Sequence, residues 1–391
     1  MAQMLADLVT LTSPPMPDAA SENSSSLLER EVYGVFGIAL DAITEASALH
    51  RARSAAYDAQ PLWISTVNVN FLLQCHQDEQ FRRSVLGSDL ATADGMPVVW
   101  LAKALGVPVP ERVAGADIFQ SLRRQKSGRP ISVFAFGGPE GIAAQLASQL
   151  NAEAGGLACA GFFFPGYGDL ESMSTPEIID QINASKADFL VVALGALKGQ
   201  LWLLKNREKL SIPVRAHLGA AINFEVGTIK RAPRIWSKFG LEWLWRIKEE
   251  PHLYRRYLAD ALGLAKMALL QIVPLLFLDR RDAWRPNRSF SIQAETCGTS
   301  ALLRLSGDAT KSSVAGAVPI FQQVADRHQI VTIELADISR LDARFLGLLL
   351  MLRQILEKKG GRLTAVNVPT AIIRRMHLRG FGFLLDHSDG L

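Results

Sequence analysis

Short apolar runs that end in glycine turns recur along the middle of the chain. The three clearest runs cover residues 131–137, 188–194 and 214–218. They end at Gly137, Gly195 and Gly219, and the first two lead into stretches with helical spacing of apolar positions. Repetition of strand, glycine turn and helix predicts a parallel α/β sheet. Because ligands bind beyond the carboxyl ends of parallel strands, these turns are the expected rim of a site.

The same pattern divides the chain into segments. Residues 1–29 are polar and serine-rich, without the basic start and apolar run of a signal peptide, and predict a flexible tail. Residues 30–60 have helical spacing and open the main α/β domain, residues 30–229. A helical segment follows at 230–280. Residues 279–300 resemble a linker, after which strands at 302–305, 330–335 and 362–366 alternate with helices at 310–327, 344–358 and 370–378. The last part, residues 281–391, therefore predicts a linker and a smaller α/β domain.

Basic and aromatic residues are interleaved in residues 230–256, which hold eight basic and three acidic side chains. This composition suits a lipid headgroup surface, a nucleic acid, or an ordinary amphipathic helix with a solvated face. The most apolar stretch follows at residues 258–278, but it contains Asp260, Lys266 and Pro274. Its more apolar part, from Met267, is about a dozen residues long, whereas a membrane span needs roughly 20. An interfacial or core helix is therefore expected.

Composition narrows the chemistry further. The chain has 391 residues, 49% of them hydrophobic, which is enough for two or three cores. The net charge of +4 gives no argument for nucleic acid, and the three separate cysteines indicate a reducing compartment. Walker, GxGxxG, HExxH, GxSxG and Asp-x-Asp patterns do not occur, and the histidines lack metal-ligand spacing. We therefore expect no cofactor and no metal.

A set of short motifs resembles the WecG/TagA/CpsF glycosyltransferases (glycosyltransferase family 26), in the same order and at the same spacing. They lie at residues 66–68, 93–100, 110–117, 136–138, 194–198, 219–221, 227–233, 240–246, 250–251 and 255–257. The resemblance covers roughly residues 34–265. It implies a Rossmann-like domain with a helical appendage. It also implies inverting transfer of a hexose or N-acetylhexosamine from a UDP-sugar to a polyprenyl-diphosphate-linked acceptor. Because no Asp-x-Asp pair occurs, this transfer is expected to be metal-independent, with cations of the protein offsetting the leaving diphosphate. Such proteins act in cell-surface polysaccharide synthesis, which implies peripheral association with the cytoplasmic face of the plasma membrane.

The resemblance implies roles for individual residues. Asp94 is the candidate base that removes the proton of the acceptor hydroxyl; the alternative is that Asp94 caps a helix starting near Met96. Thr66 and Asn68 match a polar pair near the donor, or they cap a helix at 70–78. The expected donor-binding residues are Thr66, Asn68, Gly95, Gly137, Gly195, Lys198 and Gly219. The expected acceptor and diphosphate residues are Arg112, Arg231, Arg246, Arg255 and Arg256. Arg112 has the alternative of pairing with Glu111 or Asp117.

Three positions depart from the family pattern. The family usually has glutamine and glutamate where this chain has Gly199 and Gln200, and aspartate where it has Asn223. These changes are expected to remove polar or acidic groups from the rim of the site. They keep a second hypothesis open, namely an inactive scaffold that binds lipid-linked sugar. A third hypothesis is a nucleic-acid binder built on residues 230–256.

The last hundred residues resemble a STAS domain, the fold of anti-sigma-factor antagonists, at residues 333–338, 341–344 and 347–349. Regulatory members usually have serine or threonine after the aspartate that corresponds to Asp342. Here Ala343 and Arg344 follow, so no phosphorylation switch is expected at this turn. The remaining hypotheses are a module that binds a protein partner, or a domain kept for stability or for a homo-oligomer.

Overall fold

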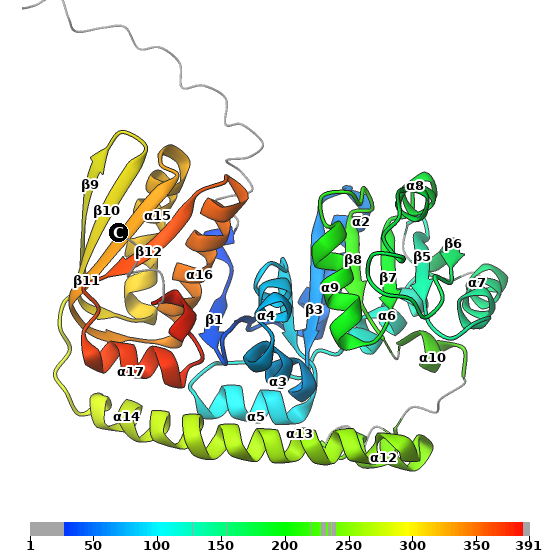
Figure 1. Ribbon diagram of the computed structural model, residues 1–391, viewed down its shortest axis with the longest axis horizontal. Coiled ribbons are helices and arrows are strands. Elements are labelled where there is room, and N and C mark those ends of the chain that lie inside the picture. Colours follow the sequence, from blue (N-terminus) through cyan, green and yellow to red (C-terminus); the bar gives the residue numbers. More distant parts are fainter. Residues whose placement is uncertain are drawn as a thin grey trace, which may run out of the picture.

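Two α/β domains stand side by side, and one long helix runs beneath both (Figure 1). The computed structural model describes residues 27–126, 128–153, 155–219, 221–227, 232–233, 236 and 240–385, without the side chain of Ala283. The larger domain precedes the long helix in the chain, and the smaller domain follows it. The order of the parts agrees with the order predicted from the sequence.

The larger domain is built on a six-stranded sheet in the order β4-β3-β8-β7-β5-β6, with all neighbours parallel. The strands are β3 (Leu62–Val67), β4 (Leu90–Ala93), β5 (Ile131–Gly137), β6 (Leu157–Phe163), β7 (Phe189–Ala193) and β8 (Val214–His217). The helices are α2 (Glu45–Tyr57), α3 (Val69–Gln77), α4 (Glu79–Leu86), α5 (Met96–Ala104), α6 (Gly115–Arg124), α7 (Ile142–Ala152), α8 (Pro176–Ala184), α9 (Ala196–Asn206) and α10 (Ala221–Glu225). Helices on both faces explain why the inner strands are continuous apolar runs. The predicted parallel α/β sheet is confirmed.

A β-hairpin precedes this sheet, where the sequence analysis expected helix from residue 30. It consists of β1 (Val32–Val35) and β2 (Ile38–Asp41), paired antiparallel. Phe36 and Gly37 form its turn with φ angles of 57° and 76°, the positive values that a two-residue hairpin turn requires. All eight strand residues are buried. The helical prediction for residues 32–41 is therefore wrong, because a segment buried on every side lacks the polar alternation that identifies a strand.

The smaller domain has a four-stranded sheet in the order β12-β11-β10-β9, in which only β9 is antiparallel. Its elements are β9 (Ser291–Cys297), β10 (Ser300–Ala309), α15 (Val314–Arg327), β11 (Ile330–Leu341), α16 (Ala343–Lys358), β12 (Arg362–Val366) and α17 (Thr370–Leu378). These bounds confirm the second α/β domain. The expected linker is shorter than predicted, because helix α14 (Val273–Ala283) occupies its beginning and β9 its end.

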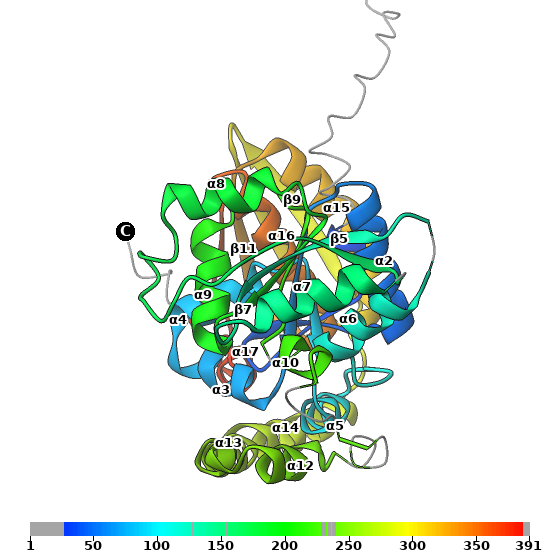
Figure 2. The same ribbon diagram turned by 90° about the vertical axis from the view of Figure 1, so that its right-hand side faces the viewer.

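The long helix begins after α12 (Glu242–Glu249) and continues from Pro251 to Asp282, through α13 (Tyr254–Met267), a π-helical turn at Ala268–Ile272, and α14. It lies at the edge of the molecule, beneath the larger domain (Figure 2). By length and composition this 32-residue helix could cross a membrane, and only 17% of its most apolar 18-residue window is buried. It is therefore longer and more exposed than the sequence analysis expected, and it is not a core helix.

Both domains hold the long helix. On the larger domain, Asn70 Nδ2 donates a hydrogen bond to Asp260 (3.2 Å), and Gly263 lies so close to α3 that an added Cβ would be 2.8 Å from Leu73. On the smaller domain, α17 contributes a buried ion pair from Arg375 to Asp282. A second pair joins Arg379 and Asp279 at 2.8 Å. The helix is thus fixed near both ends.

The two domains share a core through α16. Of its 16 residues 13 are buried, because the hairpin covers the side that faces away from its own sheet. Gly347 packs so closely on β1 that an added Cβ would lie 2.1 Å from the Val32 carbonyl oxygen. Leu27 and Leu28, which the sequence analysis placed in the flexible tail, are buried in the same apolar cluster as α16. The smaller domain is therefore packed onto the larger domain and not merely tethered to it.

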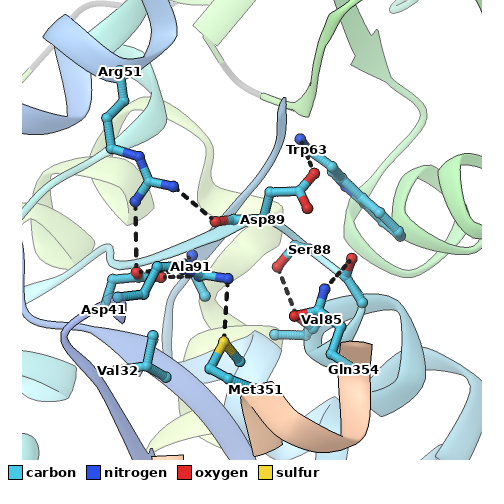
Figure 3. Close-up of polar contacts among 12 residues, drawn as sticks. Val32, Asp41, Arg51, Trp63, Val85, Ser88, Asp89, Ala91, Met351 and Gln354 are labelled. Atoms are coloured by element: carbon cyan, nitrogen blue, oxygen red, sulfur yellow. Dashed lines mark hydrogen bonds and ion pairs between the residues drawn. The ribbon is translucent and has the colours of Figure 1, made fainter. Parts of the chain in front are cut away.

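Buried polar contacts fix this junction (Figure 3). The Asp41 carboxylate pairs with Arg30 at 2.8 Å, accepts the Ala91 amide hydrogen at 2.7 Å, and lies 3.8 Å from Arg51. From α16, Gln354 donates to the Gly87 carbonyl at 3.3 Å. Asp41, at the end of the hairpin, therefore connects β2 to Arg30 and to the edge strand β4.

We predict that Asp41→Ala destabilises the whole chain by about 3–5 kcal/mol, because it leaves the buried Arg30 guanidinium without its carboxylate. Urea unfolding of the full chain measures the change. Glu79→Ala, which breaks the exposed pair with Arg83 on α4, is the control and costs less than about 0.5 kcal/mol. A loss below about 1 kcal/mol for Asp41→Ala would contradict the role given to this pair.

Candidate active site

A cavity of about 1270 Å³ lies at the carboxyl ends of β3, β4, β7 and β8, and residues of α12 and α13 line its other side. Most residues expected at the site line it: Thr66, Asn68, Asp94, Gly95, Arg112, Gly195, Lys198, Gly219, Arg246 and Arg256. Gly137 and Arg255 do not line it, and Arg231 lies outside the described residues. Residues of the predicted main domain and residues of the predicted helical appendage thus line the same cavity.

Asp94 directly follows β4, and its backbone N–H donates to the Val67 carbonyl at 2.8 Å. The residue that caps α5 is Gly95, with φ 116° and no side-chain capping bond. The alternative that Asp94 caps this helix is therefore wrong. Its carboxylate, whose side chain is 25% exposed, is left to interact across the cavity.

Three carboxylates surround the Arg112 guanidinium. Its Nη1 atom lies 3.6 Å from Asp94 and 3.5 Å from Glu242, while Nη2 contacts Asp117. Burial raises the pKa of Asp94 to about 7; Arg112 opposes this change, whereas the charges of Glu242 and Asp117 add to it. The expected alternative partner Asp117 does pair with Arg112, while Arg112 also lines the cavity, so its contact with a diphosphate stays a prediction.

Glu242 is the residue of this cluster that the sequence analysis missed. It is the first residue of α12, far from Asp94 along the chain. The sequence feature that could have identified Glu242 as a site residue is that it is the one acidic residue of the family block Gly240–Arg246.

The polar pair at the end of β3 has two different environments. Asn68 Oδ1 accepts the Phe71 amide hydrogen at 3.1 Å, so Asn68 does cap α3 while it also lines the cavity. Thr66 is buried beside Gly115, where an added Cβ would lie 3.0 Å from the Thr66 methyl group and 2.5 Å from Leu218. Gly115 therefore allows the first turn of α6 to reach the strand ends that form the cavity floor.

The glycine turns also separate into two kinds. Gly195 lies at the cavity and caps the start of α9 in a positive-φ conformation (82°). At Gly137 an added Cβ would be 2.8 Å from the Ala193 carbonyl, so this glycine serves the close approach of β5 and β7. The Lys198 amino group donates to the Gly168 carbonyl at 2.9 Å and holds the loop before α8 against α9.

Two of the three departures from the family pattern do not change the cavity lining. Gln200 is fully buried and donates to the Ser65 hydroxyl at 2.9 Å. Gly199 lies under the His217 ring, where an added Cβ would be 2.3 Å from Nδ1. Burial lowers the pKa of His217 to about 4, so this ring is neutral at physiological pH. Asn223 alone of the three lines the cavity. The expectation that residue 200 removes a group from the rim is therefore wrong.

The helical side of the cavity supplies two of the expected arginines. Arg246 pairs with Glu250 at 2.6 Å and lies 4.9 Å from the centre of the Phe224 ring. Arg256 lies on α13, 4.9 Å from the centre of the Tyr257 ring. Arg255 instead donates to the Tyr254 hydroxyl at 3.0 Å on the exposed surface. Of the described arginines on α12 and α13, Arg246 and Arg256 line the cavity.

Comparison with known families explains this arrangement. Residues 33–275 match the model of the glycosyl transferase WecG/TagA/CpsF family. The chain belongs to this family. A relative from Bacillus spizizenii is 29% identical over 197 residues, which are 50% of this chain and 75% of that protein. It is N-acetylglucosaminyldiphosphoundecaprenol N-acetyl-beta-D-mannosaminyltransferase. The resemblance of the first domain to the WecG/TagA/CpsF family is thus confirmed.

The C-terminal domain, residues 292–386, matches the model of the Mlab STAS domain. Two solved structures of SpoIIAA, an anti-sigma-factor antagonist, are similar to it: the unphosphorylated form at 19% identity and the phosphorylated Bacillus form at 18%. Each covers 24% of this chain, and 85% and 88% of the respective SpoIIAA chain, with a TM-score of 0.22. The assignment of the STAS domain rests on the family match.

Proposed function

We propose that this WecG/TagA/CpsF transferase moves a hexose or N-acetylhexosamine from a UDP-sugar to a polyprenyl-diphosphate-linked acceptor in cell-surface polysaccharide synthesis. The observation that carries the proposal is the place of the Asp94 carboxylate in a cavity that Arg246 and Arg256 also line, at the carboxyl ends of the strands. Burial raises the pKa of Asp94 to about 7. A base with a pKa near the working pH is suited to proton transfer at neutral pH. The Bacillus spizizenii relative is named for a diphosphoundecaprenol acceptor, which supports the same acceptor class here.

In this proposal Asp94 takes the proton of the acceptor hydroxyl while the oxygen of that hydroxyl attacks the anomeric carbon of the donor. The new oxygen–carbon bond forms as the bond from that carbon to the UDP oxygen breaks, so the configuration inverts and UDP leaves. Arg246 and Arg256 offset the charge of the leaving diphosphate. The proposed reaction thus assigns the stabilisation of the leaving diphosphate to these two arginines.

We predict that Asp94→Asn lowers acceptor-dependent UDP release by 10² to 10⁴-fold, the contribution typical of a general base. The assay uses the full chain, no added metal, a lipid-linked sugar acceptor and a panel of UDP-sugars. Asp180→Asn on α8, an exposed acid outside the cavity, is the matched control and keeps full activity. Release that needs no acceptor, or a fully active Asp94→Asn variant, would contradict the proposal.

The long helix is the proposed contact with the membrane. Its outer side exposes a row of large apolar side chains: Leu258, Leu262, Leu269, Leu270, Val273 and Phe277. Arg255, Lys266 and Arg280 are exposed beside this row and suit anionic headgroups. A crossing orientation would break the contacts of Asp260 and Asp282 with the two domains. We therefore propose that the helix lies in the interface, with the chain peripheral on the cytoplasmic face. The three free cysteines are consistent with that compartment.

We predict that the triple variant Leu262→Ser, Leu269→Ser, Phe277→Ser partitions onto anionic vesicles on the order of a hundredfold less than the unchanged protein. Each change withdraws on the order of 1 kcal/mol of apolar burial. Phe162→Ser, which removes an exposed aromatic on β6, is the control and leaves partitioning unchanged. Co-sedimentation of the full-length variants measures the effect, and equal binding by the triple variant would exclude this surface.

A further inference from the structure

We propose that Glu242 is a positioning residue for the transfer reaction. Glu242 shares the Arg112 guanidinium with Asp94. Asp94 is therefore an effective base only when α12 is docked over the cavity and places Glu242 beside Arg112. The inference rests on the proposed function, in which Asp94 is the base. It assigns to the appendage a second task beside the supply of arginines.

The Arg112 guanidinium lies between the carboxylates of Asp94 and Glu242. Nη2 is engaged by Asp117, which leaves Nη1 for the two remaining carboxylates. Nη1 stands almost midway between them, at 3.6 Å from Asp94 and 3.5 Å from Glu242. Both distances exceed that of a good charge-assisted hydrogen bond. Neither carboxylate therefore has the full stabilisation of the guanidinium, and each weakens the hold of the other.

The charges that face Asp94 come from three elements. Arg112 approaches from the segment before α6, Asp117 from α6 itself and Glu242 from α12, while the Gly115 amide donates to the carboxylate. Glu45, on α2, acts on Arg112 from farther away. Among the described residues, Arg112 is the cation that contacts all three of these carboxylates, and the charges of Glu242 and Asp117 both oppose the ionisation of Asp94.

The docking of α12 places Glu242. Just before this helix Gly240, with φ 70°, packs against α5, the helix that directly follows Asp94 and Gly95. An added Cβ at Gly240 would lie 2.7 Å from Trp100 and 3.0 Å from Met96. Trp243, the next residue after Glu242, is 42% exposed. Trp243 and Glu242 both line the cavity, so this short helix brings an aromatic ring to it as well as the carboxylate that lies beside Arg112.

In this proposal the charge of Glu242 keeps the Asp94 carboxylate basic. If Glu242 loses its charge, Arg112 Nη1 turns to Asp94, and the closer cation stabilises the Asp94 carboxylate. The pKa of Asp94 then falls from its value of about 7. The base is ionised above its pKa, so the acidic limb of the rate profile moves to lower pH. A less basic carboxylate accepts the proton less readily, so the plateau rate also falls.

The first experiment measures kcat/KM against pH for the full chain on vesicles with lipid-linked acceptor. The unchanged protein has an acidic limb near pH 7; Glu242→Gln moves it down by about one unit or more. Glu242→Asp keeps the carboxylate and restores part of the shift. Glu249→Gln, on the same helix but outside the cavity lining, leaves the limb in place. An unmoved limb in Glu242→Gln, or an equal shift in Glu249→Gln, overturns the proposal.

The second experiment needs no turnover and therefore separates this inference from the proposed function. Carboxyl-carbon NMR of the full chain labelled at aspartate follows the titration of Asp94, whose signal is identified by its absence in Asp94→Asn. Glu242→Gln lowers the midpoint of that signal, and an unchanged midpoint overturns the inference. Transfer by Asp94→Asn would instead overturn the proposed base, whatever the midpoint.

Discussion

The burial of α16 between its own sheet and the β1–β2 hairpin is the packing on which the rest of the structure depends. It places the STAS domain against the transferase domain, with the Asp41–Arg30 pair at the junction. The STAS domain in turn holds the far end of the long helix through Arg375 and Asp282. The near end of that helix closes the cavity. A contact formed at the start of the chain thus helps to determine the shape of a site formed by its middle.

This packing gives a physical reason for the residues that follow Asp342. Where regulatory STAS domains usually have a hydroxyl, Ala343 is buried in an apolar cluster with residues of the hairpin and α3. Arg344 donates to the Val32 carbonyl at 3.3 Å and is also buried. The turn that would carry a phosphate is therefore part of the domain junction. We infer that α16 serves this chain as a brace, and that a protein partner would have to use another surface of the STAS domain.

Several features could be predicted from the sequence because they depend on local pattern. The run Ile131–Gly137 indicated a buried strand, and the glycine after β7 indicated the rim of the site. The family motifs identified Asp94 and most of the cavity lining. The roles of Glu242 and Gln200 could not be predicted, since each depends on which side chain lies opposite in three dimensions. The hairpin was missed for a related reason, because its burial by α16 depends on residues about 300 positions away in the chain.

In the proposed function, UDP binds where the strand ends meet α12 and α13. Hydrogen exchange of the full chain, with and without UDP, tests this claim without knowledge of the donor sugar. The account predicts slower exchange in residues 66–70, 94–97, 195–198 and 242–246 when UDP is bound. Unchanged exchange in these segments, with protection confined to the sheet of the STAS domain, would contradict it.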